Sequence, residues 1–449
     1  MSSINNSNFV NFNKTSNFFG NINKKNSYAG KNNEQKVNKI KSELHQDLFW
    51  TFRILIMFFK LIGLATFAHR IVIYKKRTLY TFQYSKIGIV YNIVLSSLLI
   101  TCCYVSISFD LYHHMNLATC IYSLEFVLNA LSSYVTLIRY CINQKSLVRI
   151  VNRLITIEHE IDRMYDLYHP LRRQRVFYTM IIACILNICL LIFVIYFDIF
   201  VMGFVIVPIE DLLVFHVSWL LIQYSLLVTV IQTYFTDVNR AIQSLTRINT
   251  SDLRLQSLYQ TRRIVVNNST VHQLLQLRDM HCHLCEIAED VSSFYSLPVL
   301  FGIVYFFLSL ICDAYSLLWT LLFFGIFDFE YHIYHIVSII VVIYPIFLLT
   351  TRITRILIEM QKTGNIVHDL LKCAIGKEIK TELKKFSLQL LHRKVQFTAN
   401  GYFRLDNTFF HSLIGTVTTY FVILVQFRIG TLSSSINANF TESNVTVQG

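Results

Sequence analysis

Long runs of apolar residues dominate the pattern of hydrophobic and polar positions along this chain. A helix needs roughly 20 apolar residues to cross a bilayer, and seven runs reach that length. The runs are continuous, without the alternation every second residue that marks a transmembrane β-barrel. Only helices and closed barrels satisfy their backbone in lipid, so the pattern predicts an all-α membrane protein. We expect transmembrane helices at about 83–109, 116–138, 176–200, 211–236, 294–326, 331–357 and 405–428.

An eighth apolar stretch, at about 49–74, is weaker. Lysine-rich sequence precedes it, and three basic residues follow at 75–77. A true span would carry one of these basic flanks across the membrane. The pattern therefore predicts a helix that lies in the interface, or one that dips into the membrane and returns. Four basic or titratable residues interrupt the stretch: Arg53, Lys60, His69 and Arg70.

The links between the seven spans alternate in charge. The links at 110–115, 201–210 and 327–330 contain no lysine or arginine. Those at about 139–175, 237–293 and 358–404 contain eight, six and nine. Basic links stay on the cytosolic side of membranes. We therefore expect an inverted seven-helix topology, with the N-terminus in the cytosol and the C-terminus outside.

These boundaries divide the chain into three parts. Residues 1–46 form a cytosolic tail rich in asparagine and lysine, which we expect to be disordered. Residues 47–430 form the seven-helix domain, and residues 431–449 form an extracellular tail. Glycosylation sequons at Asn439 and Asn444 suit an exposed end. The first 40 residues contain no apolar h-region, so we expect an internal helix to act as the signal anchor.

Composition and charge agree with a membrane protein. The chain is 54% hydrophobic and 15% charged, against roughly 25% charged in ordinary soluble domains. Its net charge of +13 comes from basic residues between apolar runs, which favours contact with anionic lipid over nucleic acid. None of the ten cysteines lies in a stretch assigned to the outside, so we expect no disulfide framework.

The last span carries a specific pattern. Residues 419–427 read Thr-Tyr-Phe-Val-Ile-Leu-Val-Gln-Phe, in which Thr419, Tyr420, Gln426 and Phe427 frame five apolar residues. This pattern is similar to the signature that ends the last transmembrane helix of insect gustatory receptors. The preceding segment resembles the same family, with a Phe-Thr-Ala-Asn-Gly-Tyr run at 397–402 followed by a Leu-Asp pair. Tyr402 in place of the family's phenylalanine is a mild departure.

The resemblance implies a function. Members of this superfamily, which includes the odorant receptors, are homo- or heterotetrameric, non-selective cation channels opened directly by small-molecule tastants. In them the last helix of each subunit lines a central pore, and cytosolic extensions of the later helices form a shared anchor domain. The resemblance further implies a plasma-membrane protein of sensory neurons, on dendrites, axon and cell body, that mediates acceptance or avoidance of food compounds. It implies neither enzymatic activity nor a cofactor.

A pore-lining face can be placed on the last span. Four residues recur at i, i+3, i+7 and i+10, so they share one face of a helix: Thr416, Thr419, Ile423 and Gln426. Polar ends with an apolar middle suit a pore wall that apolar side chains can close. The alternative is that these threonines and Gln426 make buried hydrogen bonds between helices.

Ligand-binding candidates are the ionisable and amide side chains in the outer halves of the spans. Burying such groups without a use is expensive, and an aromatic neighbour could stack against a sugar ring or an aromatic bitter compound. The alternative is a structural pair or solvation of a helix end. The candidates are Glu125, Asp198, His216, Gln223, Asp313 and Trp319.

Three other classes of protein fit the sequence less well than a gustatory receptor does. A metabotropic seven-helix receptor would place its N-terminus outside, opposite to the charge bias. A transporter would be expected to show inverted repeats or helices broken by glycine and proline. A metal protein could use the His-Cys-His-Leu-Cys run at 281–285, but on a helix only His281 and Cys285 align, and no second ligand pair follows. Within the family, a co-receptor subunit without its own ligand stays open.

Overall fold

The computed structural model describes residues 55–74, 77–113, 117–164, 170–200, 208–252, 260–323, 329–373 and 377–446. Its contacts divide the chain into two units, Met1–Phe59 and Lys60–Gly449. In the first unit the described residues, 55–59, are helical. The second unit contains all the labelled strands and helices from β1 to α10.

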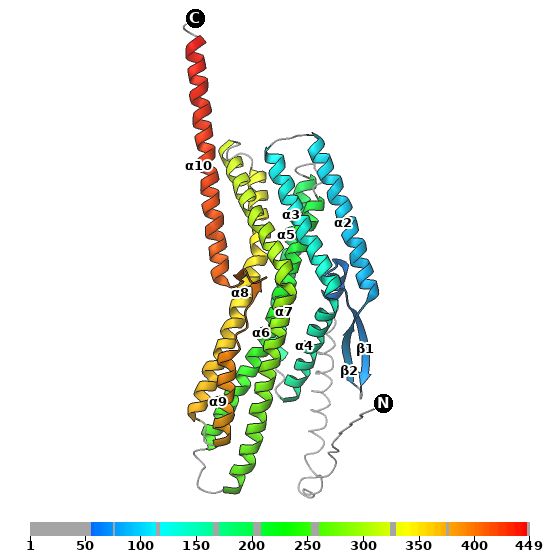
Figure 1. Cartoon of the computed structure of the whole chain (residues 1–449), viewed down its shortest axis with the longest axis vertical. Coiled ribbons are helices and arrows are strands. Elements are labelled where there is room, and N and C mark those ends of the chain that lie inside the picture. Colours follow the sequence, from blue (N-terminus) through cyan, green and yellow to red (C-terminus); the bar gives the residue numbers. More distant parts are fainter. Residues whose placement is uncertain are drawn as a thin grey trace, which may run out of the picture. The chain divides into compact units, whose positions relative to one another are not determined.

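Each expected span falls on a long helix of the second unit (Figure 1). Two shorter helices accompany them, α4 (Gln144–Met164) and α9 (Lys377–His392). The all-α fold expected from the sequence is thus confirmed. The long helices are α2 (Lys86–His113), α3 (Leu117–Ile142), α5 (Pro170–Phe200), α6 (Pro208–Asp252), α7 (Gln260–Phe323), α8 (Phe329–Cys373) and α10 (Asn407–Thr446).

Six of these helices are long and apolar enough to cross a membrane. That count covers only the residues that the structure describes. Several helices run well past their expected spans. At 1.5 Å per residue the 64 residues of α7 extend about 95 Å, three times the thickness of a hydrocarbon core. Much of the basic link that precedes the fifth span is therefore part of the same continuous helix.

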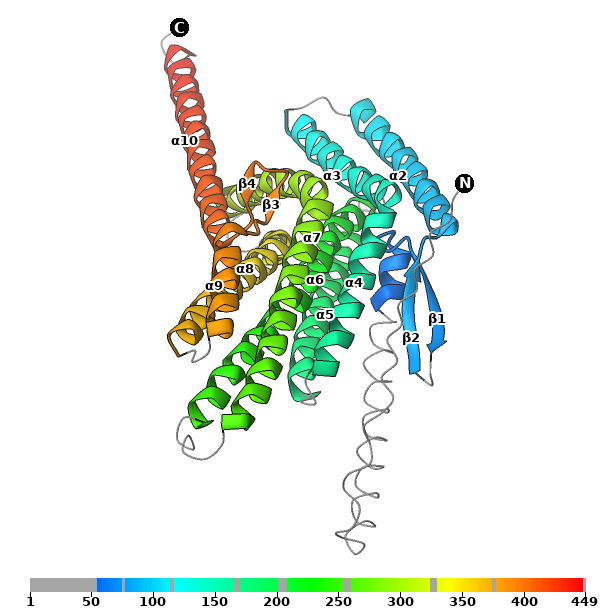
Figure 2. The same ribbon diagram turned by 60° about the horizontal axis from the view of Figure 1, so that its bottom comes forward.

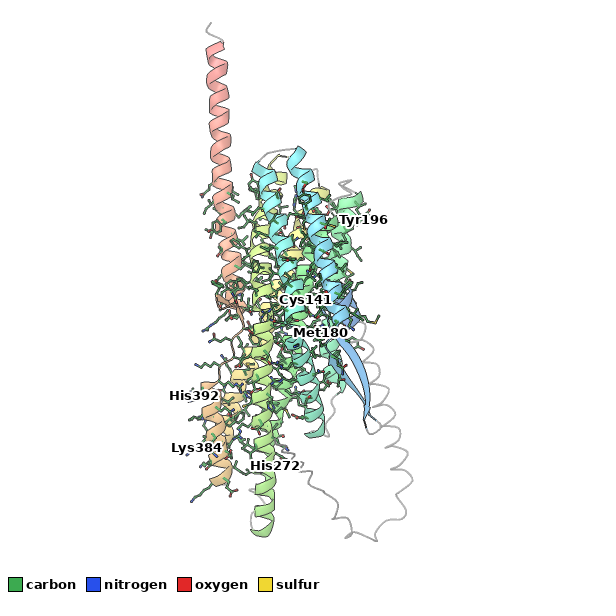
Figure 3. All side chains as sticks on the ribbon, turned by 45° about the vertical axis from the view of Figure 1, so that its right-hand side comes forward. Cys141, Met180, Tyr196, His272, Lys384 and His392 are labelled. Atoms are coloured by element: carbon green, nitrogen blue, oxygen red, sulfur yellow. The ribbon has the colours of Figure 1, made fainter. Side chains whose placement is uncertain are left out.

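The helix ends gather in two places. The end of α5, the start of α6 and the end of α7 lie together at one end of the bundle, where Asp198, Glu210 and Asp211 are found, and we call this the acidic end. The end of α6, the start of α7 and α9 lie at the other, which we call the basic end. Figure 3 shows Tyr196 towards the acidic end and His272, Lys384 and His392 towards the basic end.

Helix α6 forms the centre of the bundle and packs against α3, α5, α7 and α8. Its side chains Trp219, Tyr224 and Phe235 are fully buried. In the apolar stretch of α6, 78% of the residues are buried inside the chain, against 11% in that of α10. The principal contacts of helix α10 are with α7 and α8. Most of the surface of its apolar stretch, Asn407–Gln426, is left uncovered by its own chain.

The expected helix over about 49–74 is wrong in its second half. The helix ends near residue 61, and Ala68–Tyr74 forms strand β1, which pairs antiparallel with β2 (Arg77–Gln83). Ala68 lies opposite Gln83, and Tyr74 opposite Arg77. The β-branched and aromatic residues on both sides of the 75–77 basic cluster favour paired strands over a helix. A loop at 62–67 joins the end of the helix to this hairpin, and whether the segment enters the membrane stays a prediction.

The segment that resembles gustatory receptors before the last span forms a second, smaller hairpin. Strands β3 (Thr398–Ala399) and β4 (Phe403–Arg404) lie beside α7 at the foot of α10, as Figure 2 shows. Asn400 and Gly401 have φ angles of 50° and 80°, and the N–H of Tyr402 donates to the carbonyl of Ala399 at 3.0 Å. Asn-Gly is the pair best able to adopt two successive positive φ angles in a tight turn.

The Leu-Asp pair that follows starts α10. Leu405 is fully buried. The Oδ1 atom of Asp406 accepts from the backbone N–H groups of Thr408 at 3.0 Å and Phe409 at 3.2 Å, which is the geometry of a helix N-cap. The backbone N–H of Asn407, the residue directly after the cap, donates to the Thr354 hydroxyl of α8 at 2.9 Å. The first turn of α10 is therefore fastened to α8.

Replacing Asp406 by alanine removes the cap. We expect Asp406→Ala to lower the stability of the first turn of α10 by about 1 kcal/mol and to lower the melting temperature of the purified protein. Asp406→Asn keeps the acceptor oxygen and should melt close to the unaltered protein. Equal melting temperatures for the alanine and asparagine variants would contradict the capping role.

Candidate functional site

The predicted stripe on α10 is exposed within the subunit. Thr416, Thr419, Ile423 and Gln426 all lie on the uncovered surface of the helix. The two threonine hydroxyls donate to carbonyls of their own helix, Thr416 to Ser412 at 2.8 Å and Thr419 to Gly415 at 2.9 Å. Neither threonine therefore bonds to another helix of the chain. The side chain of Phe427 lies outside the described residues.

Tyr420 of the same motif points elsewhere. Its ring lies edge-on to Phe307 of α7, with centroids 6.0 Å apart. Near the foot of the helix, Phe410 packs against Phe347 of α8 at 5.4 Å. These aromatic contacts hold one side of α10 against α7 and α8 and leave the stripe on the open side.

A cluster of polar side chains lies towards the acidic end, between α3, α7 and α8. Ser338 of α8 donates its hydroxyl to Oδ2 of Asp313 at 2.9 Å. Glu125 of α3 is buried and interacts with Ser309 and Cys312 of α7. Glu125 and Asp313 also lie within electrostatic range of each other. The structure thus brings together two of the candidates predicted from sequence.

A second pair of carboxyl groups joins α5 to α6. Asp198 and Asp211 are both buried and interact with each other, and one oxygen of each carboxyl group has no hydrogen-bond partner among the described residues. Tyr334 of α8 also hydrogen-bonds to Asp198. Asp211 was not among the ligand-binding residues predicted from sequence. It lies directly after the 201–210 link, which the sequence pattern marks only by its lack of lysine and arginine. Tyr334 and Ser338 were missed because a lone hydroxyl in an apolar span carries no strong signal.

Two other predicted ligand residues, Gln223 and His216, face a different partner. The amide of Gln223 donates to the carbonyl of Leu64 at 2.9 Å and accepts a hydrogen bond from the hydroxyl of Tyr140. The ring of His216 is buried beside the carbonyl of Ile62, but neither ring nitrogen makes a hydrogen bond in the described part of the chain. Gln223 therefore holds the loop that precedes β1, and His216 lies beside it. Their role in ligand binding stays a prediction, and the side chain of Trp319 lies outside the described residues.

This loop, residues 62–67, is a largely buried segment without regular backbone pairing, and it follows the exposed last helical residue, Leu61. Leu64 is fully buried, and Ala65 and Phe67 nearly so. Its carbonyl groups and that of Leu61 are satisfied by side chains from the surrounding helices. The donors are Tyr91 to Leu61 at 2.5 Å, Asn92 to Gly63 at 2.8 Å, Gln223 to Leu64 at 2.9 Å, and Gln144 to Thr66.

The loop also passes very close to α2. A Cβ atom on Gly88 would lie 2.0 Å from the carbonyl oxygen of Thr66. Gly63 has a φ of +80°, and a Cβ there would lie 2.6 Å from Cδ2 of Leu137. Glycine is required at position 88 for the close approach of the backbone. At position 63 it is required both for close approach and for the positive φ angle.

The basic end is held by ion pairs. Arg278 of α7 contacts Glu382 of α9 at 2.9 Å, and Lys385 contacts the same carboxylate at 2.7 Å. These two cations, Lys385 foremost, hold the pKa of Glu382 below its ordinary value. Arg393 reaches Glu286 of α7 at 3.3 Å. Ion pairs therefore hold the 237–293 and 358–404 links together at this end.

The cysteine and histidine run at 281–285 takes part in the same packing. The ring of His281 lies between Phe235 and Phe386, at centroid distances of 5.2 and 5.6 Å. Its Nδ1 atom is 3.7 Å from the sulfur of Cys285. In the described part of the chain, no group of three His, Cys, Asp or Glu side chains is placed to hold a metal ion.

The fold and the apolar helices define a multi-pass helical membrane protein. A sequence model of the family described as "7tm Chemosensory receptor" matches residues 52–431. The chain belongs to this family of chemosensory receptors, and the resemblance to insect gustatory receptors seen in its motifs is confirmed.

Its similar proteins include gustatory receptors of Drosophila melanogaster. The chain is 29% identical over 191 residues to the putative gustatory receptor 28b and 28% identical over 183 residues to the putative gustatory receptor 28a. Each match covers 41% of the relative's length, so the chain matches about two fifths of each relative. A shorter match, 42% identical over 55 residues, is to the gustatory and pheromone receptor 32a.

The fold is similar to that of a solved insect receptor. The olfactory receptor OR5 from Machilis hrabei superposes with a TM-score of 0.58 at 16% identity, covering 86% of this chain and 99% of that one. The same receptor in complex with eugenol gives a TM-score of 0.56. At this identity the likeness shows the fold, and the family assignment shows an insect gustatory- or olfactory-type chemoreceptor.

The close approach of the loop to α2 can be tested by a single methyl group. Gly88→Ala should destabilise the protein, because the added Cβ meets backbone that cannot rotate away. Gly364→Ala in α8 is the matched control, since nothing lies within 4 Å of a Cβ there. Alanine in an open helical position stabilises by up to about 1 kcal/mol over glycine. Thermal unfolding of both variants in detergent should therefore shift in opposite directions, and a Gly88→Ala variant as stable as Gly364→Ala would refute the packing.

Proposed function

We propose that this chemoreceptor is a subunit of a tastant-gated, non-selective cation channel in the plasma membrane of insect sensory neurons. The observation that carries the proposal is the face of α10. A helix apolar enough to cross a membrane leaves two threonines and a glutamine uncovered by its own chain. An amide facing hydrocarbon costs several kcal/mol, so this face requires either water or another subunit.

Several copies arranged around an axis meet that requirement. Each copy places its α10 stripe towards the axis, where Gln426, Thr419 and Thr416 line a wet path and Ile423 narrows it. The apolar contacts of Tyr420 and Phe410 with α7 and α8 support this, because they hold the rest of the subunit on the other side of the helix. A tetramer is the arrangement that the family resemblance implies.

The polar cluster towards the acidic end is the proposed ligand site. It combines carboxyl and hydroxyl groups from α3, α5, α6, α7 and α8 in an otherwise apolar bundle. Such a site, with few polar groups on apolar walls, suits a small molecule. The charge bias of the links places this end outside the cell, where a tastant arrives.

Helix α8 offers a direct mechanical connection between the site and the pore. Ser338 contacts Asp313 at the site, and Thr354, 16 residues further along the same helix, accepts the hydrogen bond from Asn407 at the start of α10. Sixteen residues of helix extend about 24 Å. A ligand that shifts or rotates α8 at Ser338 would therefore move the attachment point of the pore helix.

The pore assignment is tested by Gln426→Leu. We expect whole-cell currents with altered conductance or gating, because the variant replaces the polar wall of the path with an apolar one. Val425→Leu, at a partly buried position about 100° around the helix from Gln426, should leave the currents unchanged. The cells express the chain alone, receive a panel of sugars and bitter compounds, and have their G-protein signalling blocked.

Each result has a distinct meaning. Normal currents from Gln426→Leu at normal surface expression would contradict the assignment of α10 to the pore. Currents that vanish when G-protein signalling is blocked would favour the metabotropic alternative. Currents that appear only with a second receptor chain would favour a heteromeric channel.

The orientation is tested through the C-terminal sequons. With the C-terminus outside, Asn439 and Asn444 become glycosylated, and the Asn439→Gln, Asn444→Gln double variant should lose the mobility shift that a glycosidase removes. The sequons at Asn13 and Asn268 would stay unmodified. A glycosidase-sensitive shift that survives the double variant would reverse the topology.

A further inference from the structure

Glu125 and Asp313 lie in a region of the bundle whose helix segments carry no lysine or arginine. Residues 87–138, 176–239 and 279–351, which include the acidic halves of α2, α3, α5, α6, α7 and α8, contain no lysine and no arginine. The ion pairs of the described residues lie towards the basic end, for example Arg278 with Glu382. Carboxylates in an apolar bundle without a compensating charge are costly.

The two carboxyl pairs differ in their contacts. Asp198 and Asp211 interact with each other and Asp198 also with Tyr334, although one oxygen of each carboxyl group has no hydrogen-bond partner in the described part of the chain. Asp313 accepts a hydrogen bond from the hydroxyl of Ser338, and Glu125 interacts with the weak donors Ser309 and Cys312. Glu125 of α3 and Asp313 of α7 thus lie within electrostatic range of each other without a lysine or arginine in the helix segments around them.

A second, independent observation lies one helical turn away. Asn129 follows Glu125 by four residues, so it lies on the same face of α3. It is fully buried, and neither atom of its amide has a hydrogen-bond partner. An unpaired buried amide marks a place that water or a ligand occupies.

The same unpaired polarity continues along the helix and across to α6. Ser132 and Ser133 of α3 and Ser218 of α6 are fully buried, and none of their hydroxyls has a partner. Ser132 faces Gly302 of α7, since a Cβ built on that glycine would lie 3.7 Å from the serine oxygen. On α3 the polar residues lie at i, i+4, i+7 and i+8 from Glu125 and therefore share one face of the helix.

We propose that the ligands of this receptor are protonated amines that carry further hydrogen-bonding groups. The ammonium group donates its N–H bonds to Glu125 and Asp313. The remaining polar atoms of the ligand, or water carried with it, reach Asn129, Ser132 and Ser218. This inference names the ligand class of the proposed ligand site and rests on that proposal.

An organic ammonium fits the site better than a metal ion. Calcium takes six to eight oxygen ligands, and in the part of the chain that the structure describes no three carboxylate, histidine or cysteine side chains are placed to hold a metal ion. An ammonium group needs only acceptors for its N–H bonds. Two carboxyl groups and the hydroxyl groups beside them supply enough acceptors for the three N–H bonds of an ammonium group.

The experiment compares amines with alcohols of the same skeleton. Tryptamine is paired with tryptophol, and glucosamine with glucose, and binding is followed as the ligand-dependent rise in melting temperature of the purified full chain at pH 7. We expect at least one amine to bind about tenfold more tightly than its alcohol. Glu125→Gln and Asp313→Asn should each abolish that preference, since the amide removes the negative charge and keeps the shape.

The control variant is Glu286→Gln at the basic end, which should keep the preference for amines. Should Glu125→Gln fail to fold, Asp313→Asn alone provides the comparison. Equal binding of amine and alcohol in both pairs, or a preference that survives both substitutions, would overturn the inference. The same is true if calcium chloride alone raises the melting temperature and blocks the amines.

Binding is measured without current, so the two proposals fail separately. A carboxylate-dependent preference for amines in a protein that passes no current supports the ligand class and contradicts the channel. Currents evoked equally by amine and alcohol support the channel and overturn the ligand class.

Discussion

Every polar group inside a membrane bundle must find its partner within the protein, because lipid offers none. The loop at residues 62–67, together with Leu61 before it, shows how this receptor meets the constraint. A chain that enters the bundle without helix or strand exposes its carbonyl groups, and here Tyr91, Asn92, Gln144 and Gln223 reach them from three helices. The positions of α2, α4 and α6 are consequently fixed against one another through a segment that belongs to none of them. Removing a donor would leave a buried carbonyl unpaired, which costs about 1–3 kcal/mol.

The same constraint separates structural polar residues from those available for function. Gln223 has both halves of its amide engaged by Leu64 and Tyr140, whereas Asn129 has neither half engaged. On the sequence alone the two side chains look alike, since each is an amide in an apolar run. The difference arises from what lies opposite them. Gln223 faces the loop, and Asn129 lies on a helix face where α6 and α7 offer no donor or acceptor to it.

The length of the continuous apolar runs was sufficient to predict the long helices, because a helix needs roughly 20 apolar residues to cross a bilayer. The prediction failed at 68–74, where the expected interfacial or re-entrant helix is instead a strand, paired in a hairpin with the segment that follows the basic cluster at 75–77. Among the candidate site residues, Glu125 and Asp313 could be selected because charge in a span is conspicuous. Ser338 and Tyr334 could not, since hydroxyls are common in apolar helices and their importance depends on which helix lies opposite. The Asn-Gly turn and the Asp406 cap were present in the motif, but their link to Thr354 depends on tertiary structure.

The sparse cover of α10 has a consequence for how such a protein is made. Within one subunit α6 is largely buried, whereas the apolar stretch of α10 is largely bare, with Thr416, Thr419 and Gln426 exposed. If other subunits cover that face as proposed, an orphan chain differs chemically from an assembled one at a single helix. Quality-control machinery that recognises such a helix would then retain orphan chains, and the exposed face of α10 would decide which chains leave together.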